Sequence, residues 1–251
     1  MTAPTLILLG LAGTLAGFID SIAGGGGIIT VPALLSAGLP PHLALGTNKL
    51  QSSFGSLTAT LRYRHGKLVK IRRTLPGILF TTIGATVGTL TIQRISPGFL
   101  QKAIPILLLA VFVYMLFSPK AGAKRNRSML TPLPFYVLMG LGIGFYDGFF
   151  GPGTGSFWTV AFVVLLGQEL KEATAHTKVM NFTSNVVALA TFAIGGHVVL
   201  VPGLAMGAGE VLGAYMGSHL VIRRGVGFIR VFFLTVVAVT LARLVYVTYI
   251  G

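Results

Sequence analysis

The sequence predicts an all-α integral membrane protein with about eight transmembrane segments, built from two homologous repeats. Three observations favour this fold class. The 251 residues are 53% hydrophobic and only 10% charged, whereas a soluble domain carries about 25% charged residues. Long runs, such as 74–93 and 179–209, contain no Asp, Glu, Lys or Arg, and a helix needs about 20 mostly apolar residues to cross a membrane. Finally, several motifs recur at a nearly constant spacing.

The repeated motifs indicate an internal duplication. Gly-Phe-Ile-Asp at 17–20 matches Gly-Phe-Tyr-Asp at 144–147, a spacing of 127 residues. Gly-Thr-Asn-Lys at 46–49 matches Ala-His-Thr-Lys at 175–178, a spacing of 129 residues. Later glycine-containing blocks match at 129 as well. Matches in the same order with the same offset predict two copies of one structural unit.

Each repeat is expected to begin with a long apolar stretch that a glycine loop interrupts, forming a re-entrant or broken helix, followed by three helices. The interrupted stretches are 5–38 and 133–167, and the helices are 47–63, 74–93, 99–117, 174–194, 199–221 and 226–248. The predicted organisation is a first transmembrane repeat at 1–117, a basic cytoplasmic linker at 118–130 and a second transmembrane repeat at 131–251.

The loops of the two repeats carry opposite charge. Residues 62–73 hold six Lys or Arg, whereas the equivalent loop near 195–201 holds none. Because Lys and Arg accumulate on the cytoplasmic side, the simplest arrangement inserts the halves upside down relative to each other, as in many secondary transporters. It places 13 basic residues inside and 2 outside, against 10 and 5 for parallel halves. Both termini are then predicted to lie outside.

The composition also limits the functions that we expect of this chain. The net charge of +14 sits in short loops between apolar runs, so we do not expect nucleic-acid binding. There is no cysteine, and no His, Asp and Glu residues have metal-ligand spacing. We expect no cofactor, no metal and no enzymatic activity. The Ser in the Gly-Thr-Gly-Ser segment at 153–156 lacks a partner motif for hydrolysis.

The glycine loops are the strongest candidate site. A regular helix does not accommodate them, and non-helical backbone at membrane depth survives only inside protein or beside a water-filled cavity. The helix that resumes after each loop presents free N–H groups, which favour an anion. A tight helix crossing without ligand is the alternative. The candidate binding residues here are Gly24, Gly25, Gly26, Gly27, Gly151, Gly153, Thr154 and Gly155.

Polar helix faces follow both loops. Residues three and four apart share a helix face, so Lys49 lies with Ser52, and Lys178 lies with Asn181. Such faces suit an oxyanion; the alternative is a lysine that extends to the membrane interface beside polar residues that hold helices together. The candidates are Asn48, Lys49, Ser52, Thr177, Lys178 and Asn181.

The sequence places three carboxylates in predicted membrane segments. Each costs about 2.5–3.5 kcal/mol to insert at a helix centre, so a structural or functional role must offset that cost. Asp20 and Asp147 either hold the glycine loops by accepting N–H bonds or take up protons during transport. Glu210 has no acidic counterpart in the first repeat, so it either couples protons or pairs with Arg230 or Arg243.

The residues resemble the TauE/SafE (sulfite exporter) family of membrane permeases. The resemblance is carried by 17–32, by Gly-Thr-Asn-Lys at 46–49 and by 144–155, and it covers nearly the whole chain. It implies a permease for sulfite, thiosulfate or organosulfonate-type anions, whereas the residues alone indicate a small anion. The second loop departs from the four-glycine run of the first, with Pro152 and Thr154.

We therefore expect a secondary transporter, an exporter by the resemblance, in a multi-pass location of the bacterial inner membrane type. A passive anion channel is the alternative, and a membrane-embedded enzyme is less favoured. The expected partners are a small inorganic or organosulfur anion and the lipid bilayer, and a second copy of the chain stays an open option.

Overall fold

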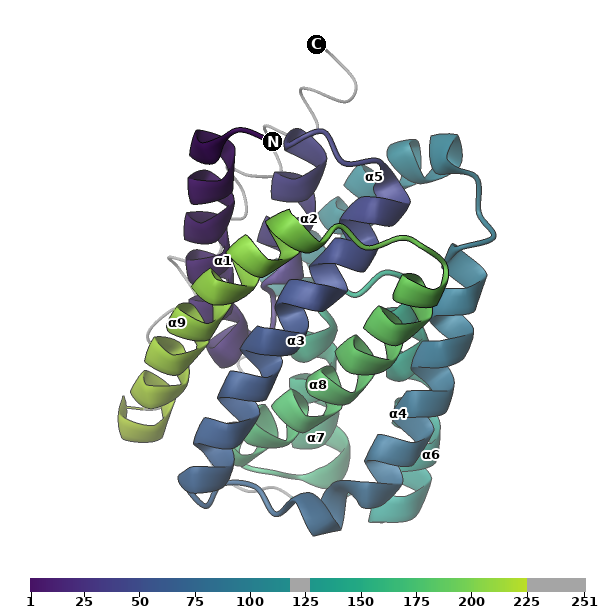
Figure 1. The fold of residues 1–251 in the computed structure, drawn as a ribbon. Coiled ribbons are helices and arrows are strands. Elements are labelled where there is room, and N and C mark those ends of the chain that lie inside the picture. Colours follow the sequence, from purple (N-terminus) through teal and green to yellow (C-terminus); the bar gives the residue numbers. More distant parts are fainter. Residues whose placement is uncertain (118–126, 225–251) are drawn as a thin grey trace.

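The computed structural model describes residues 1–117 and 127–224, and every regular element in them is an α-helix (Figure 1). The helices are α1 Ala3–Ala23, α2 Gly27–Ser36, α3 Pro41–His65, α4 Ile71–Ile92, α5 Pro97–Phe117, α6 Pro132–Phe149, α7 Thr154–Leu166, α8 Leu170–Ile194 and α9 Leu200–Arg224. The helical fold class is thus confirmed. The helix predicted at 226–248 and most of the linker predicted at 118–130 lie outside the described residues.

The glycine loops interrupt the helices where the sequence predicts. Gly24 ends α1 in the left-handed conformation, with φ of 78°, and α2 begins three residues later. Gly153 precedes α7 with φ of 84°. Such φ values favour glycine because it has no Cβ. Each glycine loop therefore lies between a long helix and a short one.

Two helix beginnings differ from the prediction. α3 starts at Pro41 and α8 at Leu170, rather than at 47 and 174. Proline at the first helical position has its φ already set for a helix and needs no N–H partner there, which accounts for the earlier start of α3. With 25 residues each at about 1.5 Å per residue, both helices exceed the roughly 30 Å hydrocarbon core.

The equivalent helices pack in equivalent pairs. α1 packs along α9, α6 packs along α4, and α3 packs against α8 between them (Figure 1). At the two outer pairs the backbones approach closely: a Cβ added to Gly84 would collide with α6, and one added to Gly213 would collide with α1. Small residues at helix contacts are typical of membrane proteins.

Polar side chains of α3 lie inside the bundle, whereas many large apolar side chains are exposed on its surface. Thr47, Lys49 and Gln51 are buried on α3, whereas Leu75 and Leu79 are exposed on α4. Among the described helices, α1, α4 and α5 are long and apolar enough by composition to cross a membrane. The longer α3 and α8 fall outside that group because they carry the buried polar residues. This distribution suits a chain whose surroundings are lipid.

Candidate functional site

The two glycine loops meet at the centre of the molecule. The Ser156 N–H, in the first turn of α7, donates to the Gly24 carbonyl at 3.2 Å, and Ser156 Oγ donates to the Ala23 carbonyl at 2.8 Å. A Cβ added to Gly24 would collide with the backbone of Gly155, and one added to Gly155 would collide with Gly24. Glycine at both positions therefore lets the first half contact the second backbone to backbone.

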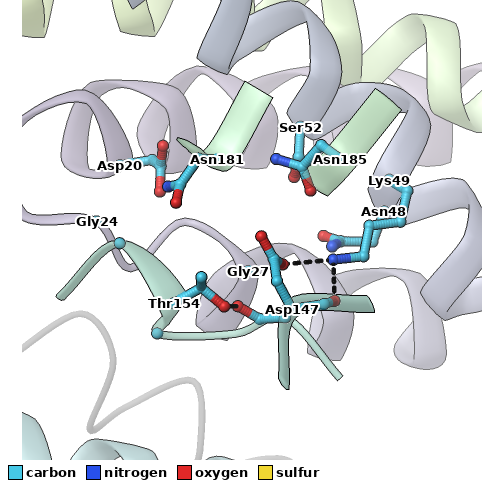
Figure 2. A pocket seen from close by; sticks show the side chains of 13 residues that line it. Asp20, Gly24, Gly27, Asn48, Lys49, Ser52, Asp147, Thr154, Asn181 and Asn185 are labelled. Atoms are coloured by element: carbon cyan, nitrogen blue, oxygen red, sulfur yellow. Dashed lines mark hydrogen bonds and ion pairs between the residues drawn. The ribbon is translucent and has the colours of Figure 1, made fainter. Parts of the chain in front are cut away.

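Each candidate lysine pairs with the aspartate of the other half. Lys49 Nζ lies 2.6 Å from Asp147 Oδ1 and 2.5 Å from the Asp147 carbonyl oxygen (Figure 2). Lys178 Nζ lies 2.9 Å from Asp20 Oδ2 and also donates to the Asp20 carbonyl oxygen. The two lysine side chains are 1% and 0% exposed. Buried charges need such partners, so these pairs satisfy the lysines and join the halves.

In each pair, one carboxylate oxygen does not contact the lysine, and the hydrogen-bond donor to that oxygen differs between the two pairs. Asp147 Oδ2 accepts a hydrogen bond from the Ser184 hydroxyl. Asp20 Oδ1 accepts the Gly26 N–H at 3.3 Å and so holds its own glycine loop. The Asp20 side chain is 22% exposed, against 4% for Asp147. The two pairs therefore come from matching sequence motifs but have different surroundings.

A small polar cavity lies between the loops and the polar faces of α3 and α8 (Figure 2). Its lining consists of Asp20, Gly24, Gly27, Asn48, Lys49, Ser52, Asp147, Gly151, Gly153, Thr154, Gly155, Asn181 and Asn185. The volume that the centre of a water-sized sphere can occupy in this cavity is about 20 Å³. That is room for roughly one water molecule. In this conformation the cavity must widen to admit an anion of several atoms.

Most of the predicted binding residues line this cavity. Gly25, Gly26, Thr177, Lys178 and Glu210 do not, although Lys178 pairs with Asp20, which does. The Thr177 hydroxyl instead lies 3.1 Å from the Thr159 hydroxyl. The cavity also contains Asn185, which was outside the predicted binding set. Its position four residues after Asn181 on the same helix face is the signal for it.

The amide side chains leave hydrogen-bonding capacity unused. Asn48 Oδ1 accepts from Thr30 Oγ1 at 2.6 Å and from Gln51 Nε2 at 2.8 Å, which fixes that amide. Asn181 is 4% exposed, and its Oδ1 has no hydrogen-bond partner among the residues that the structure describes. A buried polar atom without a partner costs about 1–3 kcal/mol. A ligand or water in the cavity can supply the missing bond.

Within the described parts of the chain, each of the two lysines also has a third N–H donor without an acceptor. An ammonium has three N–H donors, and Lys49 uses two on Asp147. Lys178 likewise uses two on Asp20. Together with the first turns of α2 and α7, whose positive dipole ends face the cavity residues, this set suits a small oxyanion. The two aspartates balance the two lysines, so the four side chains carry no net charge when all are ionised.

Comparison with known proteins agrees with a membrane permease. The family model described as "Sulfite exporter TauE/SafE" matches residues 9–244. A "Probable membrane transporter protein" of Haemophilus influenzae is 44% identical over 96% of this chain and 94% of its own length. The "Probable membrane transporter protein YfcA" of Escherichia coli K12 is 44% identical, over 98% of this chain and 92% of its own length. A third, "ORF9" of Sinorhizobium, is 47% identical, over 94% and 90%.

The family match spans nearly the whole described bundle and includes both glycine loops and both lysine helices. It agrees with the apolar α1, α4 and α5 and with the inward polar faces. The chain therefore belongs to the sulfite exporter TauE/SafE family of membrane transporter proteins.

Proposed function

We propose that this chain is a secondary transporter of small sulfur oxyanions, such as sulfite, thiosulfate or organosulfonates, and that it exports them across a bacterial inner membrane. The observation that carries the proposal is the cavity between the two glycine loops, with a buried lysine of one half on its wall. The sulfur-anion class comes from the family name and from nothing in the cavity itself.

The two halves, 1–117 and 131–251, insert as inverted repeats in this proposal. Figure 1 draws the turn between α3 and α4 at the lower end of the bundle and the equivalent turn between α8 and α9 at the upper end, which supports it. The binding site then lies near the membrane midplane between half-helices, as in other inverted-repeat transporters. Alternating access follows if the halves rock about the loops where they meet.

In this proposal, the anion binds when Lys49 exchanges its contact with Asp147 for a contact with the anion. When a proton or a movement weakens the bond between Lys49 and Asp147, the ammonium can turn its charge to an anion in the cavity. Asn48, Ser52 and Asn181 supply neutral polar groups around it. The positive dipole ends of α2 and α7 add to the attraction for an anion, although most N–H groups of their first turns, such as those of Ile28 and Ser156, already donate to carbonyl oxygens of the loops. No step in this scheme changes a covalent bond of the substrate, so the proposed activity is transport and not catalysis.

The test is uptake of labelled thiosulfate and sulfite into proteoliposomes that contain the purified protein, with competition by sulfate, chloride and organosulfonates. Saturable uptake that sulfur anions inhibit best is the expected result. Flux that never saturates and cannot be driven uphill would favour a passive anion channel in the same cavity. Absence of flux for every anion, with folded protein in the vesicles, would contradict the proposed function.

A further inference from the structure

The two lysine–aspartate pairs differ at one equivalent position. Ser184, which donates to Asp147, corresponds to Gly55 in the first half at the repeat spacing of 129 residues. Gly55 has no side chain to donate to Asp20. The space beside it holds the Glu210 carboxylate instead, because a Cβ added to Gly55 would collide with Glu210 Oε2.

Glu210 is itself the odd member of an equivalent pair. Its counterpart, 129 residues earlier, is Thr81 on α4. The packing confirms this equivalence: a Cβ on Gly17 of α1 would meet the Glu210 backbone, and one on Gly144 of α6 would meet the Thr81 backbone. Two equivalent positions thus differ between the halves. One position pairs Thr81 with Glu210, and the other pairs Ser184 with Gly55.

This exchange puts a second buried acid next to one ion pair. Glu210 is 2% exposed, and the charges of Asp20 and Lys178 both act on its carboxylate. With both carboxylates ionised, these three groups would carry a net charge of −1 in a low-dielectric interior. An ionised carboxylate buried near a second carboxylate is costly, and a proton on one of the two removes that cost.

Several other titratable groups on α3 and α9 bind partners away from Glu210. On α3, Lys49 pairs with Asp147, and the Tyr63 hydroxyl donates to the Ser21 carbonyl at 2.7 Å. Arg62 of α3 lies 2.9 Å from His219 Nδ1 of α9 and stacks over Tyr215. Arg230 and Arg243 lie outside the described residues, so the test below must include their effect.

We propose that Glu210, Asp20 and Lys178 form a proton-binding site, one per chain, that carries the coupling proton of the anion transporter. The proposal rests on the proposed function for its role in transport. One proton on either carboxyl leaves the group neutral. When the O–H bond at Glu210 breaks and one forms at Asp20, the negative charge moves from Asp20, which lines the cavity, to Glu210, which does not, so an anion in the cavity no longer faces the Asp20 carboxylate. Proton and anion then cross together.

The first test needs no substrate. Infrared difference spectra of the purified full-length protein, taken between alkaline and acidic buffers, should show the C=O stretch of a buried protonated carboxyl in the wild type. Glu210→Gln should lack that band, and the exposed control Glu169→Gln should keep it. A band that persists in Glu210→Gln, or no such band in the wild type because an arginine neutralises Glu210, would overturn the proposal.

A second variant keeps the proposal testable if Glu210→Gln does not fold. Gly55→Ser combined with Glu210→Thr installs the arrangement already found at Ser184 and Thr81, so it removes the acid while filling its space. It should fold and should also lack the carboxyl band. A retained band in this double variant would overturn the proposal in the same way.

The second measurement tests coupling with thiosulfate in proteoliposomes whose membrane potential is clamped at zero. For one proton per anion, each pH unit across the membrane supports about a tenfold accumulation on the alkaline side. The wild type and Glu169→Gln should approach this ratio, whereas both Glu210 variants should reach a ratio near one. Accumulation by the Glu210 variants would refute the coupling role. A wild type that moves no anion would refute the proposed function instead, and the infrared result would still decide the proton site.

Discussion

At the scale of single residues, the lysines are explained by partners that lie far away in the sequence. Lys49 meets an aspartate 98 residues later, and Lys178 meets one 158 residues earlier. The sequence indicated cationic helix faces and buried carboxylates, but the spacing rules that predicted them act within one helix. Contacts between helices depend on packing, so the pairing became visible only in the structure. From the sequence alone, the aspartates and the lysines are separate features.

The pairing makes a prediction about stability. Asp147→Asn leaves the buried Lys49 ammonium without a carboxylate, and removal of one partner of a buried pair costs about 3–5 kcal/mol. Adding Lys49→Gln removes the stranded charge and should restore most of that loss. The measurement is thermal unfolding in detergent, followed by fluorescence of the buried Trp158. If the double variant is as unstable as the sum of the single ones, the two side chains are not coupled.

The same lysines make a prediction about transport. Lys49→Ala and Lys178→Ala should both insert into the membrane but transport thiosulfate at least roughly tenfold more slowly, because loss of one charge-assisted contact of about 1.5–3 kcal/mol lowers anion affinity. Lys171→Ala is the matched control, since Lys171 is a partly buried lysine on α8 that donates to the Ile222 carbonyl outside the cavity. Wild-type flux in both cavity variants would count against the proposed binding role.

At the scale of the elements, the glycine loops decide how the halves meet. The sequence predicted both loops at the right residues, because glycine runs and Pro152 are incompatible with a regular helix. It did not predict that one loop packs directly on the other, with Gly24 against Gly155. That contact needs two glycines 131 residues apart to face each other, and no local pattern encodes it.

This contact predicts an asymmetric response to two equal substitutions. Gly155→Ala places a methyl group against the Gly24 backbone, and such overpacking costs about 1–3 kcal/mol. Gly142→Ala, in the interior of α6 with open space around it, should be neutral or stabilise the helix by up to about 1 kcal/mol. Thermal unfolding of the two variants decides. Equal midpoints would mean that the loops do not touch as described.

At the scale of the whole molecule, the charge of the loops predicts that the two halves insert in inverted orientations. The chain offers a matched pair of positions to test this prediction. Arg64 and Ala193 are equivalent at a spacing of 129, both are exposed, and both lie at the end of a long helix. The absence of cysteine from the chain allows single-cysteine variants without other changes.

In intact cells, a membrane-impermeant maleimide should label Ala193→Cys, whereas Arg64→Cys should react only after lysis. The reason is that inversion puts equivalent helix ends on opposite sides of the membrane. Labelling of both variants from the same side would show that the halves insert in parallel, and the midplane cavity would then need another explanation.

Counterflow of thiosulfate tests the central claim most directly, because it asks whether one site between the halves opens to each side in turn. Proteoliposomes are loaded with unlabelled thiosulfate and diluted into a trace of labelled thiosulfate. An alternating-access carrier with this cavity should accumulate label transiently above its equilibrium level, and Lys49→Ala should abolish the overshoot. Label that enters only to equilibrium in the wild type, with no overshoot at any internal concentration, would contradict the carrier account.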